Sequence, residues 1–486
     1  MRRLALLILI STALAQTGPA AQPAPAQNAG YIDAYTAWDE GHYVVALERL
    51  KALLPGADEA TFEHIALLTG ELYQTHEVTA DGRNPSLSLD GTLIAYETGS
   101  GGAAATRIVR NAPGFPLVVS FTGTGAVIGP TSKQIAYRYG AGRMAIRNVG
   151  AFLGDPIALT PGGASAAVWS TDGAALYFID APADAAAQQV FSMPASGGAA
   201  RPLTTLAGRK SNLRLIPGGA ALLFTTGGGG GRGGGQATPQ VQSYIDLRTG
   251  EAGVFEDAST PPVFSADGGT LAYIARDGGV SRLRIRSGRA PATTALETTD
   301  RIDAPALSPD GSRVAFQRML RDDWEIFVSD REGKDVRRVT REIQHDLLPR
   351  FLTNDRLFAL VGEARHRRSH VYDLTTGTGQ RVFHNNTIRT IAPEYIWQTS
   401  QDGARVLIQA DRDGNTVSPE RGVYVVDLTK KISRADLSAR IDAMLEAERG
   451  LRAFAARVTR PLDASIRQIV DSASVSRVYG YEKALF

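Results

Sequence analysis

Apolar and polar positions alternate through most of the chain, and the alternation is interrupted at regular intervals by the same short polar turn. Each copy has an apolar residue, Ser, any residue, Asp-Gly, two residues, and then an apolar run that ends in an aromatic residue. The clearest copies are Leu307–Phe316 and Phe264–Tyr273. Asp-Gly between alternating apolar residues is typical of a hairpin, because Gly accepts a positive φ and Asp hydrogen-bonds its own backbone. The pattern therefore predicts repeated antiparallel strands.

The turn recurs eight times between residues 84 and 428. Two further clear copies are Leu87–Tyr96 and Trp169–Phe178, and weakened copies occur at Gly129–Tyr137, Ile216–Phe224, Phe351–Leu360 and Thr399–Ile408. Equivalent residues of successive copies are 41 to 49 positions apart, which matches a four-stranded propeller blade of roughly 40–50 residues. The fold class that we expect is mainly β, a β-propeller of about eight four-stranded blades. Seven blades remain the alternative if a weakened copy is a loop.

The second half of each unit also repeats. Trp324–Asp330 is followed by Gly333-Lys334 and by Arg338-Val339-Thr340, and Gln189–Met193 is followed by Pro202-Leu203-Thr204. Motif, period and half-repeat together resemble the TolB-like (WD-type) propeller repeat over residues 84–428. That resemblance implies an exported envelope protein whose loops on one propeller face engage protein partners. Ring closure must come from strand pairing between the two ends or from flanking helices, because the chain has no cysteine.

Residues 31–76 have helical apolar spacing and predict three short helices. Ala34, Gly41, Tyr43 and Ala46 resemble the small and aromatic positions of one tetratricopeptide repeat. Such repeats bury their faces only by stacking. A single unit is therefore expected to pack on the propeller, with protein docking as the alternative.

Residues 433–486 are expected to be helical. Ser433 to Asp436 has the form of a capping box, and Pro461 separates a first helix from a second one that starts at Leu462. The stretch from Leu462 to Phe486 resembles the lead-in helix of co-catalytic zinc exopeptidases related to aminopeptidase Y and glutamate carboxypeptidase. The zinc-binding domain of that family is absent from this sequence, so no peptidase residue is carried over. The resemblance implies the N-terminal part of a propeller–peptidase fusion.

The first 15 residues have the layout of a secretory signal peptide: Arg2-Arg3, an apolar run, and a small-x-small site at Ala13-Leu14-Ala15. Residues 16–30 are expected to be a spacer. The apolar run is shorter than the roughly 20 residues of a membrane-spanning helix. We therefore expect a periplasmic or secreted protein without a membrane span.

Charge and cysteine content exclude several partners and chemistries. The chain carries 52 basic and 50 acidic residues, a formal charge of +2, which gives no general attraction for nucleic acid. Without cysteine there is no disulfide, thiolate metal site or lipoprotein attachment residue. A protein partner is the expectation, and the oligomeric state stays open.

Four motifs could suggest a site, and each is better explained as structure. Gly227–Gly235 lacks the Gly-Lys-Ser/Thr of a phosphate-binding loop and is expected to be a loop between strands or blades. His366 and His370, near Glu363, have helical metal-ligand spacing but precede a predicted strand. His76-Glu77 begins like a zincin motif, although Ala80 replaces the second His.

The fourth motif is Asp411, Asp413 and Asn415, which resembles half of a calcium loop, yet Gly422 stands where Glu is required. The chain also has no Gly-x-Ser-x-Gly nucleophile elbow. We therefore assign no catalytic, cofactor-binding or metal-binding residue and expect no cofactor. The leading hypothesis is a non-catalytic binding or scaffold module of the cell envelope. The alternatives are an accessory propeller of a secreted zinc exopeptidase and, last, an autonomous propeller enzyme.

Overall fold

The computed structural model describes residues 28–458 and 468, except 101–103, 141, 151–155, 165, 182–187, 206, 228–239, 289, 342–343, 364–366, 384–393 and 412–420. The chain divides into two compact units. Gly70–Ile432 form one unit, and Met1–Thr69 together with Ser433–Phe486 form the other.

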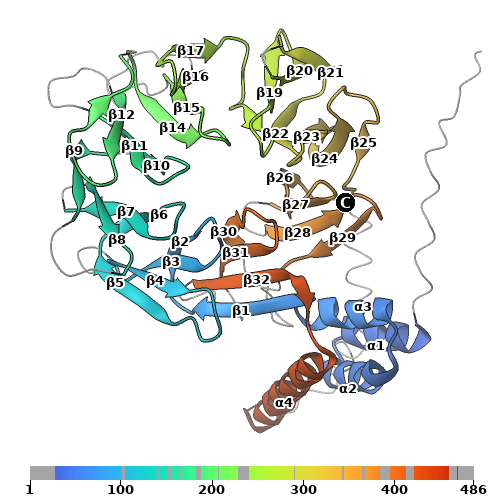
Figure 1. Ribbon diagram of the computed structural model, residues 1–486. Helices are drawn as coiled ribbons and strands as arrows, with labels where there is room; N and C mark the ends of the chain where they lie inside the picture. The colour runs from blue at the N-terminus through green and yellow to red at the C-terminus, as the bar shows by residue number, and fades with distance from the viewer. Residues whose placement is uncertain are drawn as a thin grey trace, which may run out of the picture. The chain divides into compact units, whose positions relative to one another are not determined.

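The unit Gly70–Ile432 is a propeller of eight four-stranded antiparallel blades arranged in a ring (Figure 1). This confirms eight blades over the alternative of seven. Blade 1 consists of β2 (Arg83–Leu87), β3 (Leu93–Thr98), β4 (Ala105–Arg110) and β5 (Leu117–Thr122), and blade 2 of β6 (Thr124–Ile128), β7 (Gln134–Tyr139), β8 (Arg143–Asn148) and β9 (Ala158–Gly163). Blade 3 consists of β10 (Ala166–Trp169), β11 (Ala175–Asp180), β12 (Gln189–Pro194) and β13 (Arg201–Pro202), and blade 4 of β14 (Lys210–Leu215), β15 (Ala221–Thr226), β16 (Val241–Asp246) and β17 (Ala252–Phe255). Blade 5 consists of β18 (Val263–Phe264), β19 (Thr270–Asp277), β20 (Val280–Ser287) and β21 (Thr293–Thr298). Blade 6 consists of β22 (Ile302–Leu307), β23 (Arg313–Leu320), β24 (Asp323–Asp330) and β25 (Arg337–Arg338). Blade 7 consists of β26 (Asp346–Phe351), β27 (Arg356–Val361), β28 (Arg368–Asp373) and β29 (Thr378–Arg381).

Blade 8 joins the two ends of the propeller. Its three inner strands, β30 (Glu394–Thr399), β31 (Arg405–Ala410) and β32 (Gly422–Lys431), come from the end of the ring, and its outer strand β1 (Tyr73–Thr79) comes from the beginning. β1 pairs antiparallel with β32, with His76 opposite Val425. The ring is therefore closed by strand pairing, one of the two routes expected from the sequence. The boundary drawn at residue 76 is wrong, because Tyr73–Thr79 is a strand of the propeller.

The repeated serine and aspartate build the same turn in five blades. In blade 6, Ser308 Oγ donates to Asp310 Oδ1 at 2.6 Å and accepts the amide of Arg313 at 3.0 Å. Gly311 follows with φ +69°, a conformation that favours glycine. The same pairs are Ser88–Asp90, Ser170–Asp172, Ser265–Asp267 and Ser400–Asp402. The motif therefore fixes the hairpin between the first and second strands.

Apolar side chains between neighbouring blades form the core of the ring. The motif aromatics Phe178 and Phe316 are fully buried and stack on Phe191 and Phe327 of the adjoining strands. One described cluster, between blades 2 and 3, holds eleven buried residues. Each blade is apolar on both faces because it packs against a neighbour on either side.

The second unit is helical. It contains α1 (Ala29–Asp39), α2 (Tyr43–Leu53), the 3-10 turn η1 (Leu54–Gly56), α3 (Glu59–Thr69) and α4 (Arg434–Val458). Ala34 and Ala46 are completely buried, and Gly41 turns the chain between α1 and α2 at φ +78°. α4 contacts these helices: Arg434 donates to the carbonyls of Leu54 and Ala57 at 2.6 Å.

The predicted contact between Ser433 and Asp436 at the start of α4 is present. Ser433 Oγ accepts the amide of Asp436 at 3.1 Å and donates to its carboxylate at 2.7 Å. The second predicted helix, from Leu462, falls almost wholly outside the described residues.

Candidate functional site

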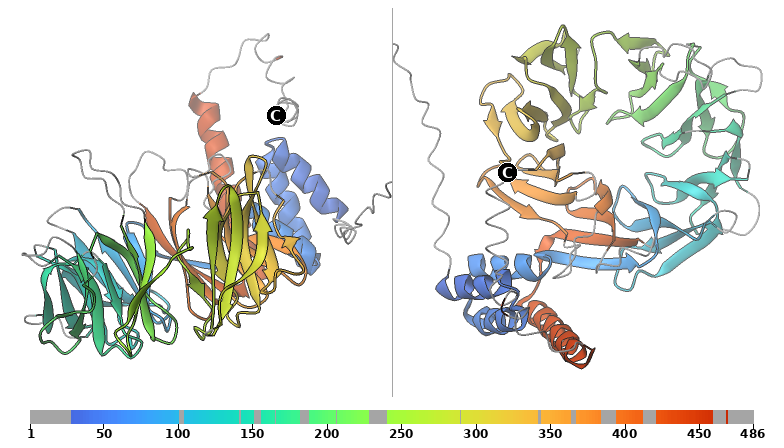
Figure 2. Two further views of the ribbon diagram at one scale, coloured as in Figure 1. Left: turned by 90° about the horizontal axis from the view of Figure 1, so that it is seen from above. Right: turned by 180° about the vertical axis from the view of Figure 1, so that it is seen from behind.

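The two faces of the propeller differ in the connections that they carry. In each antiparallel blade the turn between the first and second strands lies on one face, which we call the turn face, and in blades 1 to 7 the third-to-fourth-strand turn lies there as well. The second-to-third-strand turns and the connections between blades lie on the other, the loop face. Figure 2 shows the blades edge on, with the strands running from one face to the other. The motif aspartates of the turn face are occupied by their own turns, so they mark no site.

Histidine and carboxylate side chains meet on the loop face at the junction of blades 6 and 7. His345 precedes β26, Asp323 begins β24, and Glu363 follows β27. His345 Nδ1 lies 2.6 Å from Asp323 Oδ1, and its Nε2 lies 3.5 Å from Glu363 Oε1. The side chains of His345 and Asp323 are each 29% exposed, and that of Glu363 is 68% exposed. The imidazole is therefore held between two carboxylates while it stays accessible to solvent.

An aromatic and a cationic side chain adjoin this histidine. The Trp324 amide lies 3.3 Å from His345 Nδ1, and the Arg301 guanidinium carbon lies 5.4 Å from the centre of the Trp324 ring. Arg301 immediately precedes β22, the first strand of blade 6. We call the five residues Arg301, Asp323, Trp324, His345 and Glu363 the His345 site.

The chemistry of the His345 site suits recognition. Asp323 Oδ1 lies 2.6 Å from Nδ1 of His345, and this hydrogen bond orients the imidazole. Among the described residues the polar groups that contact the ring are Asp323, Glu363 and the Trp324 amide. No group of three or more His, Cys, Asp or Glu side chains in the described ranges is arranged to hold a metal ion.

A second ionisable cluster lies buried between blades 7 and 8. Glu394, at the start of β30, is 1% exposed, and it accepts from the Ser369 amide at 3.2 Å and from Trp397 Nε1 at 2.5 Å. Burial raises the pKa of Glu394 to about 7, although these donors and Arg381 oppose the change. Burial likewise lowers the pKa of Arg381 to about 10. These groups join two blades and lie out of reach of a large ligand.

The structure describes only some residues of the four sequence motifs. His370 is inside β28, where burial lowers its pKa to about 4, and His366 is outside the described residues, so no helical metal-binding face includes His370. His76 and Glu77 belong to β1. Asp411 accepts from the Tyr395 hydroxyl at 2.6 Å.

The rest of these motifs fall mainly on undescribed residues. Asp413 and Asn415 lie outside the described ranges, as does Gly227–Gly235 except its first residue. That stretch joins β15 to β16, the second and third strands of blade 4, so it is a connection within a blade.

Sequence reasoning missed the His345 site. Asp323 and His345 are 22 positions apart, with no motif that links them. The available signal was their position in the repeat, since both lie at the loop-face ends of strands that the repeats already locate.

Among the described helices, none is long and apolar enough to cross a lipid bilayer.

Comparison with known proteins supports the propeller fold. No protein-family model matches the chain, and no curated protein matches it significantly. Dipeptidyl peptidase 4 of Porphyromonas gingivalis is similar with a TM-score of 0.51 and 12% identity, over 80% of this chain and 63% of that one. A prolyl endopeptidase structure has a TM-score of 0.48 and 11% identity, over 79% of this chain and 60% of that one. TolB of Acinetobacter baumannii has a TM-score of 0.34 and 11% identity, over 70% of this chain and 80% of that one. The chain thus spans about 60% of the two peptidases, and at these identities the likeness concerns the fold alone.

Proposed function

We propose that this chain is an exported, non-catalytic propeller that binds a protein partner of the cell envelope through its loop face. The His345 site is the observation that carries the proposal. Trp and Arg are the residues most enriched at energetic centres of protein interfaces, and here Arg301 stacks on Trp324 beside solvent-accessible charges. The signal-peptide pattern of residues 1–15 supports export.

The side chains of the His345 site are preorganised in the unbound protein. Asp323 fixes the His345 ring, and Arg301 is held over the indole, so little side-chain entropy remains to be lost on association. The site also combines acidic, basic and aromatic groups from two blades. Such a surface favours a polar, mixed-charge protein segment over a lipid or a nucleic acid.

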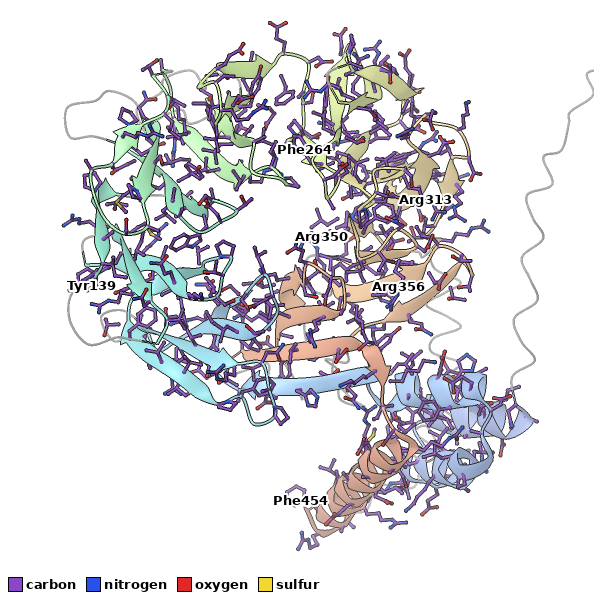
Figure 3. All side chains as sticks on the ribbon, in the orientation of Figure 1. Tyr139, Phe264, Arg313, Arg350, Arg356 and Phe454 are labelled. Carbon is purple, nitrogen blue, oxygen red and sulfur yellow. The ribbon has the colours of Figure 1, made fainter. Side chains whose placement is uncertain are left out.

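The test is quantitative capture from envelope extract on the purified chain, compared with Trp324→Ala. We expect one envelope protein to be enriched by the wild type and reduced at least tenfold by the variant. Tyr139→Ala is the matched control, because Tyr139 is an exposed aromatic at the loop-face end of blade 2 (Figure 3). Equal capture by wild type and Trp324→Ala, or no specific capture at all, contradicts the proposal.

A second candidate is the accessory propeller of a secreted zinc exopeptidase. The fold match to a dipeptidyl peptidase and the resemblance of Leu462 to Phe486 to an exopeptidase lead-in favour it. Sequencing the DNA beyond the codon for Phe486 distinguishes the two: an open frame encoding a His-x-Asp zinc peptidase supports the accessory role. With aminopeptidase substrates and added zinc, both candidates predict no turnover by this chain. Turnover contradicts both.

A further inference from the structure

The first strands of five blades share a distortion at the inner edge of the ring. β2, β6, β14, β22 and β26 each contain a register shift. A residue with positive φ lies within each shift: Asn84, Gly125, Asn212, Ala304 and Leu348. A bulge of this kind turns nearby side chains away from the regular alternation. The residue two positions later is therefore equivalent in all five blades.

Arginine occupies this equivalent position in two blades, Arg214 in β14 and Arg350 in β26. The other three blades have uncharged Ser86, Val127 and Ala306 there. Both arginines are exposed, and Figure 3 shows Arg350 at the inner edge of the ring. Each lies toward the turn-face end of its strand.

Each guanidinium is anchored by one carbonyl of the next blade. Arg214 Nη2 donates to the Pro262 carbonyl at 3.1 Å, and Arg350 Nη1 donates to the Trp397 carbonyl at 3.5 Å. A guanidinium has five N–H donors, so most of the donors on each arginine remain available. The anchoring carbonyl limits the motion of the side chain, which lowers the entropy lost when a ligand binds.

Neither arginine has a carboxylate partner among the described residues. The acidic residues of the first strands lie at the opposite, loop-face end: Asp303 pairs with Arg276, while Asp346 and Glu394 are buried. Desolvation by the surrounding protein lowers the pKa of Arg214 and of Arg350. This edge therefore carries positive charge that its own strands do not neutralise.

We propose that Arg214 and Arg350 form an anion-binding rim at the turn-face end of the ring's inner edge, which binds carboxylate groups of a ligand. Guanidinium groups suit this ligand because their planar donors match the two oxygens of a carboxylate. The carboxylates come either from an acidic peptide or from a small polycarboxylate. The rim is separate from the His345 site, which lies on the loop face.

The experiment measures binding of labelled hexaglutamate by fluorescence anisotropy and of citrate by calorimetry, on the full chain at low salt. We expect at least one probe to bind, and which one binds identifies the source of the carboxylates. The double variant R214Q/R350Q should weaken that binding at least tenfold. R248Q/R331Q is the matched control, since it removes the same charge from third-to-fourth-strand turns of the same face and should change affinity less than twofold.

A conservative variant keeps the test valid if the Gln variant unfolds. R214K/R350K retains the charge but loses the paired donors, so we expect affinity between that of wild type and of the Gln variant, with an unchanged melting temperature. Trp324→Ala should leave probe binding intact, which separates this rim from the proposed partner site. The proposal is overturned if neither probe binds, or if both arginine variants bind as the wild type does.

Discussion

At the scale of single residues, two carboxylates of this propeller respond to their surroundings in opposite directions. Asp90 sits in the turn of blade 1, where burial raises its pKa but donors from Ser88, Thr92 and Ser132 outweigh that effect and lower it to about 2. Glu394 is enclosed between blades 7 and 8, and burial raises its pKa to about 7. The direction of each pKa change depends on whether hydrogen bonds donated to the carboxylate outweigh its loss of contact with water.

Asp90→Asn should destabilise the protein at neutral pH and not in acid. A carboxylate with a depressed pKa contributes stability above its unfolded value of 3.8, and that contribution is lost as pH falls toward 2. Because Asp90 is largely solvent-exposed, we expect a loss of only about 1 kcal/mol at pH 7. Urea unfolding at pH 7 and at pH 2.5 measures it. An equal difference at both pH values contradicts the mechanism.

Glu394→Gln should have the opposite pH dependence. Because the folded pKa of Glu394 lies above its ordinary 4.5, its contribution is fully present below pH 4.5 and is lost as pH rises through about 7. Relative to the variant, the wild type should lose on the order of 3 kcal/mol between pH 4.5 and pH 8.5. Thermal unfolding across this range measures the difference. Parallel curves for the two proteins would exclude a neutral, buried Glu394.

At the scale of secondary-structure elements, the short strand β1 has a large effect on the whole propeller. It is the only strand of blade 8 that comes from the N-terminal end of the described propeller, and it covers the edge of β32 along Tyr73–Thr79. An uncovered strand edge is a template for pairing with another chain. β1 therefore both closes the ring and protects it from aggregation.

Removal of β1 should open the propeller. We compare the fragment of residues 70–432 with the fragment of residues 80–432, which differ only in β1 and its flanking residues. The longer fragment should unfold in one cooperative step, and the shorter one should melt several degrees lower and associate. Calorimetry and light scattering measure both effects. Indistinguishable behaviour of the two fragments would show that β1 does not close the ring.

At the scale of the whole propeller, the seams between blades are unequal. The described cluster between blades 4 and 5 has four buried residues, against eleven between blades 2 and 3. The strands of blade 4 contribute to it only through partly buried Phe255, and β18 is two residues long. Polar contacts of Asp257 with Tyr273 and Arg284 supplement this seam. Blades 4 and 5 should therefore separate first.

Matched substitutions at two seams test this order. Phe178→Ala, between blades 2 and 3, should cost about 3–5 kcal/mol, as expected for a fully buried aromatic. Phe255→Ala should cost less than half as much and should accelerate amide exchange in β17 and β18 without affecting β10–β13. Denaturant unfolding and hydrogen-exchange mass spectrometry give the two readouts. A larger cost for Phe255→Ala than for Phe178→Ala contradicts the inferred order.

Most of the fold was predictable from the sequence, and the candidate site was not. The turn at Ser308–Gly311 is local: its serine, aspartate and glycine are within four positions, so their chemistry is visible in any copy. The His345 site brings together residues at the loop-face ends of three different strands, β24, β26 and β27. No short pattern encodes such a meeting, because it depends on how two blades pack.

The amino-acid sequence by itself determined the hairpin turns and their period, and hence a propeller of about eight blades with seven as the alternative, since these features depend on contacts between near neighbours along the chain. Only the tertiary structure decided that Tyr73–Thr79 completes the last blade, and that His345 meets Asp323 and Glu363. It also decided that Arg214 and Arg350 share one position on the inner edge. These outcomes depend on strand register and on packing between residues far apart in the chain, which local side-chain chemistry does not specify.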